Sequence, residues 1–202
     1  MENSQDSSSV SADYQGEIAD SHLVVIDVEH FRESGSVWQI VLFAPYLGKK
    51  FSSFVKRDHS NITTQMSTTL TRLKVPIGTW KQIMINAPTP EEVASNVIAF
   101  LEEIPGSIQL VHFGGSDVKK TTEFLELQKH SLTERAKPFN SMNPLKHASA
   151  YYNKAQKKTP GSLATMHKAL SSQQSKLRAM KCAAPDHDAR VDVAKLWELL
   201  KH

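Results

Sequence analysis

Hydrophobic positions along the chain form short runs and helical repeats after residue 20 and are sparse before it. Residues 22–30 (HLVVIDVEH) are rich in β-branched side chains, and residues 37–44 and 51–56 have a similar pattern. These three runs predict three consecutive strands, and the short apolar run at 108–111 predicts a fourth.

Helical spacing begins in the middle of the chain. Thr89 suits an N-cap, Pro90 suits the first helical position, and Glu92 completes a capping box, so a helix is predicted from Thr89 to the stop at Pro105. A second helix is predicted from about Asp117, and a last helix from about residue 187 to residue 200.

Two segments have weaker patterns. Pro76, Gly78 and Pro88 interrupt any long element in residues 58–88, and residues 135–185 are expected to form two or three helices. Three sequential strands followed by helix, strand and helices predict an α/β fold, with a mixed sheet covered by helices.

Length and composition limit the class of protein. A chain of 202 residues suits one domain, expected at residues 21–202, after a flexible acidic leader at residues 1–20. The single cysteine, Cys182, cannot form an internal disulfide, and no apolar run is long enough to cross a bilayer. The first residues do not resemble a secretory signal. We therefore expect an intracellular protein, cytoplasmic or nuclear, that is neither secreted nor bound to a membrane.

Charge is unevenly distributed along the chain. Residues 1–20 contain five acids and no Lys or Arg, whereas residues 135–185 contain ten Lys or Arg and no acid. A basic stretch of this kind is typical of a surface that contacts a polyanion, and it is equally typical of solvated helix faces. Within it, Lys154, Lys157 and Lys158 follow two tyrosines and are candidates for contacts with a nucleic-acid strand.

Two acids are expected side by side on the first strand. Asp27 and Glu29 are two residues apart, so on a strand both project from the same face. Close carboxylates are costly unless a cation lies between them, and Mg²⁺ and Mn²⁺ prefer such oxygen ligands. Two exposed acids at the end of a strand are the alternative interpretation.

Two further acids follow histidines. Asp117 comes five residues after His112, where an N-terminal cap is the simpler interpretation. Asp192 comes five residues after His187, a separation of about 140° on an ideal helix. His187 and Asp192 therefore converge only if His187 lies in the loop ahead of the last helix, and otherwise both face solvent.

The order of these motifs resembles that of a known family. VVIDVE, VHFGGSDVKKTTEFL and HDARVDVAKLWELL are similar to the three motifs of the DEDDh 3′–5′ exonucleases, the DnaQ-like branch of the ribonuclease-H-like fold. GSLATMHKAL is similar to the family's helix ahead of the third motif, and the resemblance covers roughly residues 22–201.

The resemblance implies a fold, an activity and a set of site residues. It implies a ribonuclease-H-like mixed sheet of about five strands flanked by helices, and hydrolysis of RNA or DNA from a free 3′ end to release 5′-monophosphates. It also implies two divalent cations, Mg²⁺ or Mn²⁺, held by four acidic ligands, with a histidine as general base. By that resemblance the ligands are Asp27, Glu29, Asp117 and Asp192, and the base is His187.

The chain departs from the family at positions that shape the pocket for the terminal nucleotide. Phe113 stands where asparagine is usual, Ser116 where an aromatic residue is usual, and His30-Phe31 replaces a small polar pair with glycine. These departures leave the substrate preference open. The candidate contacts to the terminal nucleotide are His30, Phe31, His112 and Phe113, with Phe31 or Phe113 either stacking on a base or packing internally.

The expected partner is a single-stranded 3′ end, and a homodimer is left open because relatives are often dimers. Two other classes of protein remain as alternatives. One is a catalytically silent nucleic-acid-binding or scaffold protein with the same fold, which the loss of a site residue would mark, although all five are present. The other is an unrelated α/β domain with accidental acids.

Overall fold

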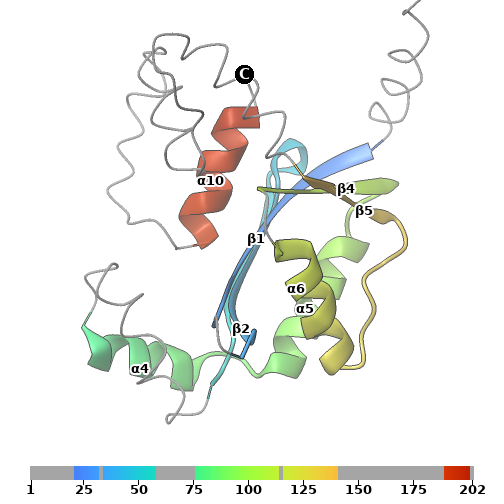
Figure 1. Ribbon diagram of the computed structural model, residues 1–202. Coiled ribbons are helices and arrows are strands. Elements are labelled where there is room, and N and C mark those ends of the chain that lie inside the picture. Colours follow the sequence, from blue (N-terminus) through green and yellow to red (C-terminus); the bar gives the residue numbers. More distant parts are fainter. Residues whose placement is uncertain (1–20, 32–33, 58–75, 114–115, 141–188, 201–202) are drawn as a thin grey trace, which may run out of the picture.

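The computed structural model of the chain describes residues 21–31, 34–57, 76–113, 116–140 and 189–200. These residues form one five-stranded sheet with helices on both faces (Figure 1). The strands are β1 (Ser21–His30), β2 (Val37–Ala44), β3 (Lys49–Phe54), β4 (Ser107–His112) and β5 (Ala136–Asn140). The helices are α4 (Ile77–Asn86), α5 (Pro90–Glu102), α6 (Asp117–Leu127) and α10 (Ala189–Leu200), with a 3₁₀ turn at Pro45–Leu47.

The sheet is mixed, with strand order β3-β2-β1-β4-β5. The first three strands pair antiparallel, and β4 and β5 join the other edge of β1 in parallel. The parallel pairing of β1 with β4 ends at Val25 and Val111, so the last part of β1 extends beyond β4. That extension carries the first two acids of the site.

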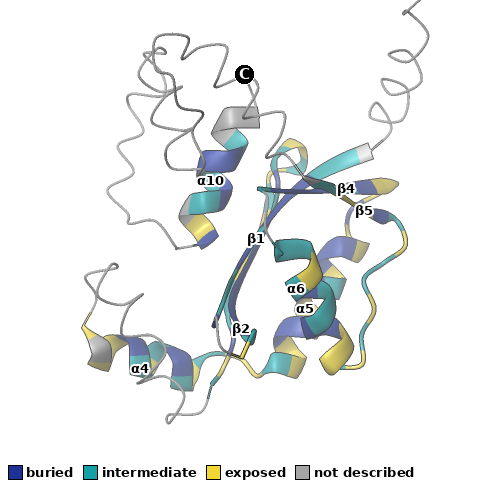
Figure 2. Cartoon of the chain, viewed as in Figure 1, coloured by how far each residue is buried: buried dark blue, intermediate teal, exposed yellow. Residues whose placement is uncertain are grey.

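Alternation along β1 divides the core between the two faces of the sheet. Val24, Ile26 and Val28 are buried in the main core with residues of α5 and α6. Val25 is buried on the opposite face, against α10. In Figure 2, buried positions line the sheet and the sides of α5 and α6 that face it. Position by position, β1 thus turns its odd-numbered residues toward α10.

A smaller apolar cluster lies at the α4 end of the sheet. Phe31, Trp38, Trp80 and Met84 are buried together, with Phe54 packed against them. The Trp38 and Trp80 rings meet edge to face, with their centroids 5.8 Å apart. This aromatic cluster fixes α4 to the β1–β2–β3 side of the sheet.

Most elements predicted from the sequence are confirmed. The strands β1, β2 and β4 and the helices α5, α6 and α10 lie within a few residues of the expected ranges, and Thr89 and Glu92 form the capping box. The third strand covers Lys49–Phe54 instead of residues 51–56. The predicted α/β fold with a mixed five-stranded sheet flanked by helices is also confirmed.

Other expectations need correction or lie outside the described residues. Helix α4 forms where no long element was predicted, and β5 opens the stretch that was expected to be helical. Asp117 is the first residue of α6 and not its cap, because Ser116 occupies the N-cap position. The expected flexible leader and the helices predicted within residues 141–188 lie outside the described residues.

Candidate metal centre

The site begins with two acids on the face of β1 that packs against α10. Leu23 and Val25 contribute to the apolar cluster beneath α10, and the same alternation carries Asp27 and Glu29 onto this face. Both acids are half-buried. As predicted from their spacing, their carboxylates project together at the end of an apolar strand.

Helix α10 brings a third acid to the same place. Ala189, Val193 and Leu196 are buried against the sheet, which leaves Asp192 at the border of the apolar stripe and directed toward β1. One carboxylate oxygen from each of Asp27, Glu29 and Asp192 lies within 4.8 Å of the other two. Residues 163 positions apart in sequence therefore form one acidic group.

Gln39 of β2 holds the start of α10. Its side chain is buried, with the residue 1% exposed, and its Oε1 accepts a hydrogen bond from the backbone N–H of Ala189 at 3.1 Å. This N–H is one of the first in the helix and has no partner within the helix itself. Sequence reasoning missed Gln39, although a single polar residue in the buried run VWQIVLFA was the available signal.

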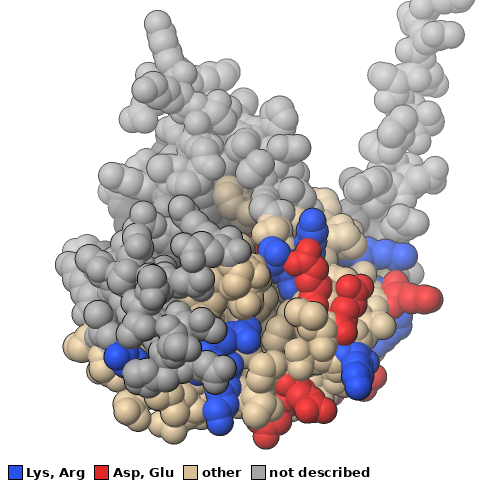
Figure 3. Space-filling model, turned by 60° about the horizontal axis from the view of Figure 1, so that its bottom comes forward, with Lys and Arg blue, Asp and Glu red and all other residues tan. Residues whose placement is uncertain are grey.

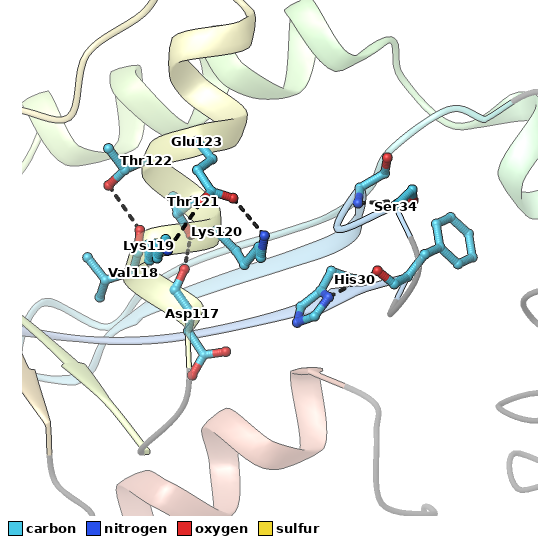
Figure 4. A network of polar contacts seen from close by, with 11 residues as sticks. His30, Ser34, Asp117, Val118, Lys119, Lys120, Thr121, Thr122 and Glu123 are labelled. Atoms are coloured by element: carbon cyan, nitrogen blue, oxygen red, sulfur yellow. Dashed lines mark hydrogen bonds and ion pairs between the residues drawn. The ribbon is translucent and has the colours of Figure 1, made fainter.

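Asp117, the fourth predicted ligand, lies beside the acidic group at the first position of α6. Burial raises the pKa of Asp117 to about 7, contacts with the backbone of Val28 and of its own residue oppose this rise, and the negative charge of Asp192 adds to it. Figure 4 shows the Asp117 carboxylate directed toward α10. The contact with Val28 is available because β4 ends before that point of β1.

The loop that follows β1 is held against α6. Phe31 N–H donates to the carbonyl of Ser36, and Gly35 N–H donates to the carbonyl of Phe31. Gly35 has a φ of +67°, and a Cβ placed there would lie 2.8 Å from Lys120 Nζ. Lys120 in turn donates to Glu123 Oε2 at 2.7 Å (Figure 4). The loop and the first turns of α6 thus pack closely beside Asp117.

A lysine that sequence reasoning did not single out also borders the site. Lys195 of α10 has a side chain only 7% exposed, and its Nζ lies 3.6 Å from Asp192 Oδ1. The signal in the sequence was a basic residue three positions after the acid, on the same side of the helix.

The candidate substrate contacts that the structure describes lie in different surroundings. His30 is half-buried at the end of β1, His112 is 8% exposed, and Phe113 is half-buried against the α10 cluster. Phe31 is 5% exposed within the aromatic cluster, an environment typical of internal packing. The remaining predicted site residues, His187, Lys154, Lys157 and Lys158, lie outside the described residues.

The donor set fits a hard divalent cation. Three carboxylates converge within 4.8 Å, and the neighbouring Asp117 has a pKa raised by burial and by Asp192. A cation between crowded carboxylates relieves their mutual repulsion, and oxygen ligands of this type suit Mg²⁺ and Mn²⁺.

Outside this acidic group, positively and negatively charged side chains lie close to one another on the surface. Figure 3 shows basic and acidic residues interspersed over the described part of the face in view. Most of the basic stretch at residues 135–185 lies outside the described residues. None of the described helices is both long enough and apolar enough to span a membrane.

Compared by sequence, the chain matches no protein-family model and no curated protein. Compared by structure, it matches ribonuclease-H-like 3′-exonucleases at low sequence identity. The nuclease domain of 3′hExo, a DEDDh family member solved with rAMP, superposes with a TM-score of 0.57 at 15% identity, covering 89% of this chain and 90% of that one. Product-bound exonuclease I gives a TM-score of 0.59 at 10% identity over 90% of this chain and 43% of that one.

A third match is S. pombe Pop2p, solved in an Mg²⁺- and Mn²⁺-bound form, with a TM-score of 0.51 at 11% identity over 93% of this chain and 84% of that one. These matches establish the ribonuclease-H-like fold. The resemblance to the DEDDh exonucleases that the three motifs predicted is thereby confirmed at the level of the fold.

Proposed function

We propose that this protein is a metal-dependent 3′–5′ exonuclease that removes nucleotides from a free 3′ end of RNA or DNA and releases 5′-monophosphates. The observation that carries the proposal is the convergence of Asp27, Glu29 and Asp192 within 4.8 Å. It supports a nuclease because the convergence occurs in a fold whose solved neighbours include 3′-exonucleases.

Asp27, Glu29, Asp117 and Asp192 would hold two divalent cations, Mg²⁺ or Mn²⁺. Two such cations would supply activation of a water molecule and stabilisation of the leaving oxygen of a phosphodiester. Burial raises the pKa of Asp117 to about 7, so at neutral pH its carboxyl group is protonated in part of the molecules and would lose that proton on becoming a ligand. Binding of cations is therefore expected to release protons.

His187 is the proposed general base. It precedes the first residue of α10 by two positions in the sequence, and Gln39 anchors that first residue through the N–H of Ala189. Histidine titrates near neutral pH and suits removal of a proton from the attacking water. Gln39 would thus help to position both His187 and Asp192 relative to β1.

The proposed contacts to the terminal nucleotide are His30 and His112, the last residues of β1 and β4, and Phe113, which follows β4. The burial of Phe31 supports a packing role for that ring. Lys154, Lys157 and Lys158 are proposed to contact phosphates further along the strand, which predicts binding that weakens with salt.

The test is a time course with 5′-labelled RNA and DNA oligonucleotides, single-stranded, blunt and overhanging, in Mg²⁺ or Mn²⁺. We expect stepwise shortening that a chelator stops and that Asp27→Asn abolishes. The control variant is Glu134→Gln, an exposed acid in a turn, which should cleave like the wild type. Binding of the oligonucleotides without shortening in any cation would contradict the proposal and favour a silent nucleic-acid-binding protein of the same fold.

A further inference from the structure

A buried ammonium group borders the proposed metal centre. Lys195 is 5% exposed, and its Nζ lies 3.6 Å from Asp192 Oδ1. Lysine is almost never fully buried unless it is paired, because removing an ammonium from water costs several kcal/mol. The negative charge of Asp192 offsets part of that cost.

The backbone keeps this ammonium close to the acid. Lys195 and Asp192 are three residues apart on α10, and the neighbouring Val193 and Leu196 are each 2% exposed against the sheet. The lysine and the ligand are therefore carried by one anchored helix.

An ion pair on the other side of the molecule shows the contrast. Lys49 and Glu103 lie 2.7 Å apart with side chains 42% and 61% exposed. Pairs of that kind are solvated and contribute little. The Lys195 pair is longer, at 3.6 Å, but its side chains are only 7% and 19% exposed, so its charges interact at a lower dielectric.

Counting formal charges shows what the lysine adds. Four carboxylates and two divalent cations cancel, so Lys195 would leave the loaded site with one positive charge. A phosphodiester linkage carries one negative charge and would restore neutrality. The same positive charge repels divalent cations while no phosphodiester is present.

We propose that Lys195 is a positioning residue that supplies a permanent positive charge to the acidic site, weakening the binding of divalent cations to the free protein and strengthening the binding of the phosphate group to the loaded site. This inference rests on the proposed function. It predicts that replacing Lys195 strengthens the binding of divalent cations and weakens the binding of the phosphate group. If the role of the lysine were purely structural, its replacement would weaken both affinities or neither.

The experiment uses calorimetric titration of the full-length protein with Mn²⁺ alone, followed by titration of the Mn²⁺-saturated protein with adenosine 5′-monophosphate. For Lys195→Met we expect Mn²⁺ to bind at least about tenfold more tightly, because a unit charge across one carboxylate has that effect on a divalent ion in a water-like dielectric and a larger one at a lower dielectric. We expect the monophosphate to bind severalfold more weakly. Lys195→Arg keeps the charge and should keep both affinities near those of the wild type.

Lys49→Met is the matched control, since it removes an exposed ammonium from a remote ion pair. Unchanged or weaker Mn²⁺ binding by Lys195→Met would overturn the inference while leaving the exonuclease proposal intact. If Lys195→Met does not fold, Lys195→Gln is measured in the same way, and failure of both variants to fold would show a structural role and overturn the inference. If the wild type neither binds Mn²⁺ nor shortens oligonucleotides, the proposed function itself fails.

Discussion

Replacing Asp27 by asparagine is expected to stabilise the metal-free protein. One carboxylate oxygen of Asp27 lies within 4.8 Å of oxygens of both Glu29 and Asp192. Two unit charges at 4.8 Å repel by about 3.5 kcal/mol at an effective dielectric of about 20, and by about 1 kcal/mol in bulk water. The site is half-buried and Lys195 offsets part of the charge of Asp192, so we expect a gain of about 1–3 kcal/mol in the free energy of unfolding.

Thermal unfolding in a chelator, with and without added Mg²⁺ or Mn²⁺, measures this effect. For a chain of this size a gain of about 1–3 kcal/mol raises Tm by roughly 2–12 °C. A cation at about one hundred times its Kd adds about 2.7 kcal/mol to the stability of the wild type. Asp27→Asn lacks one ligand, so the cation should stabilise it much less than it stabilises the wild type. The difference in Tm between the two proteins should therefore narrow or reverse when the cation is added.

Glu134→Gln is the control for loss of one negative charge, because Glu134 is exposed and distant from the acidic group in sequence. Its unfolding should lie within about 0.5 kcal/mol of the wild type in both conditions. If Asp27→Asn is less stable than the wild type in the chelator and the cation stabilises both proteins equally, repulsion among these acids is not what the cation relieves.

Three further predictions concern Asp117, Gln39 and His187. The unfolded chain loses the Asp117 proton near the ordinary pKa of 3.8, whereas the folded protein keeps it until about pH 7. The free energy of unfolding of the metal-free protein should therefore fall as the pH rises from 3.8 to about 7, by at most about 4 kcal/mol. Urea unfolding against pH checks this, and Asp117→Asn should remove the fall; parallel profiles for the two proteins would contradict it. Gln39→Leu should lower the free energy of unfolding by about 1–3 kcal/mol, because it leaves the buried N–H of Ala189 without its partner, and it should lower kcat more than it raises KM. Equal unfolding midpoints and equal kcat would show that Gln39 does not position α10. His187→Ala should reduce the rate of cleavage by about 10²–10⁴ with little loss of nucleic-acid affinity, measured by single-turnover cleavage and equilibrium binding; loss of affinity at an unchanged rate would make His187 a substrate contact.

The local rules of strands and helices were sufficient to predict half of the site. Asp27 and Glu29 are brought together by the two-residue period of β1. Asp192 was expected as a ligand only through the resemblance to the DEDDh exonucleases, and the burial of the apolar stripe of α10 explains why it lies at the site. Gln39 and Lys195 could not be predicted in this way. Their roles depend on α10 packing against β2, a contact between residues 150 positions apart in the case of Gln39 and Ala189.

Two elements were missed, α4 because prolines were taken to interrupt regular structure and β5 because its stretch was expected to be helical. Pro76 is the N-cap of α4, a position that breaks no helical hydrogen bond, and Trp80 and Met84 stabilise the helix by packing in the aromatic cluster. Pro138 lies in β5, at the edge of the sheet, where a strand tolerates a residue without an N–H. In both places tertiary packing decides the structure, and the sequence within the segment does not show it.

In the proposed function, the carboxylates between β1 and α10 hold divalent cations against a phosphate. Crystals grown with Mn²⁺ and a nucleoside 5′-monophosphate test it most directly, through the anomalous scattering of manganese. We predict a manganese peak in contact with Asp27, Glu29 and Asp192, with the phosphate bound to it, and no such peak in crystals of Asp27→Asn. Manganese bound only elsewhere, at a concentration that supports stepwise shortening of oligonucleotides, would contradict the account.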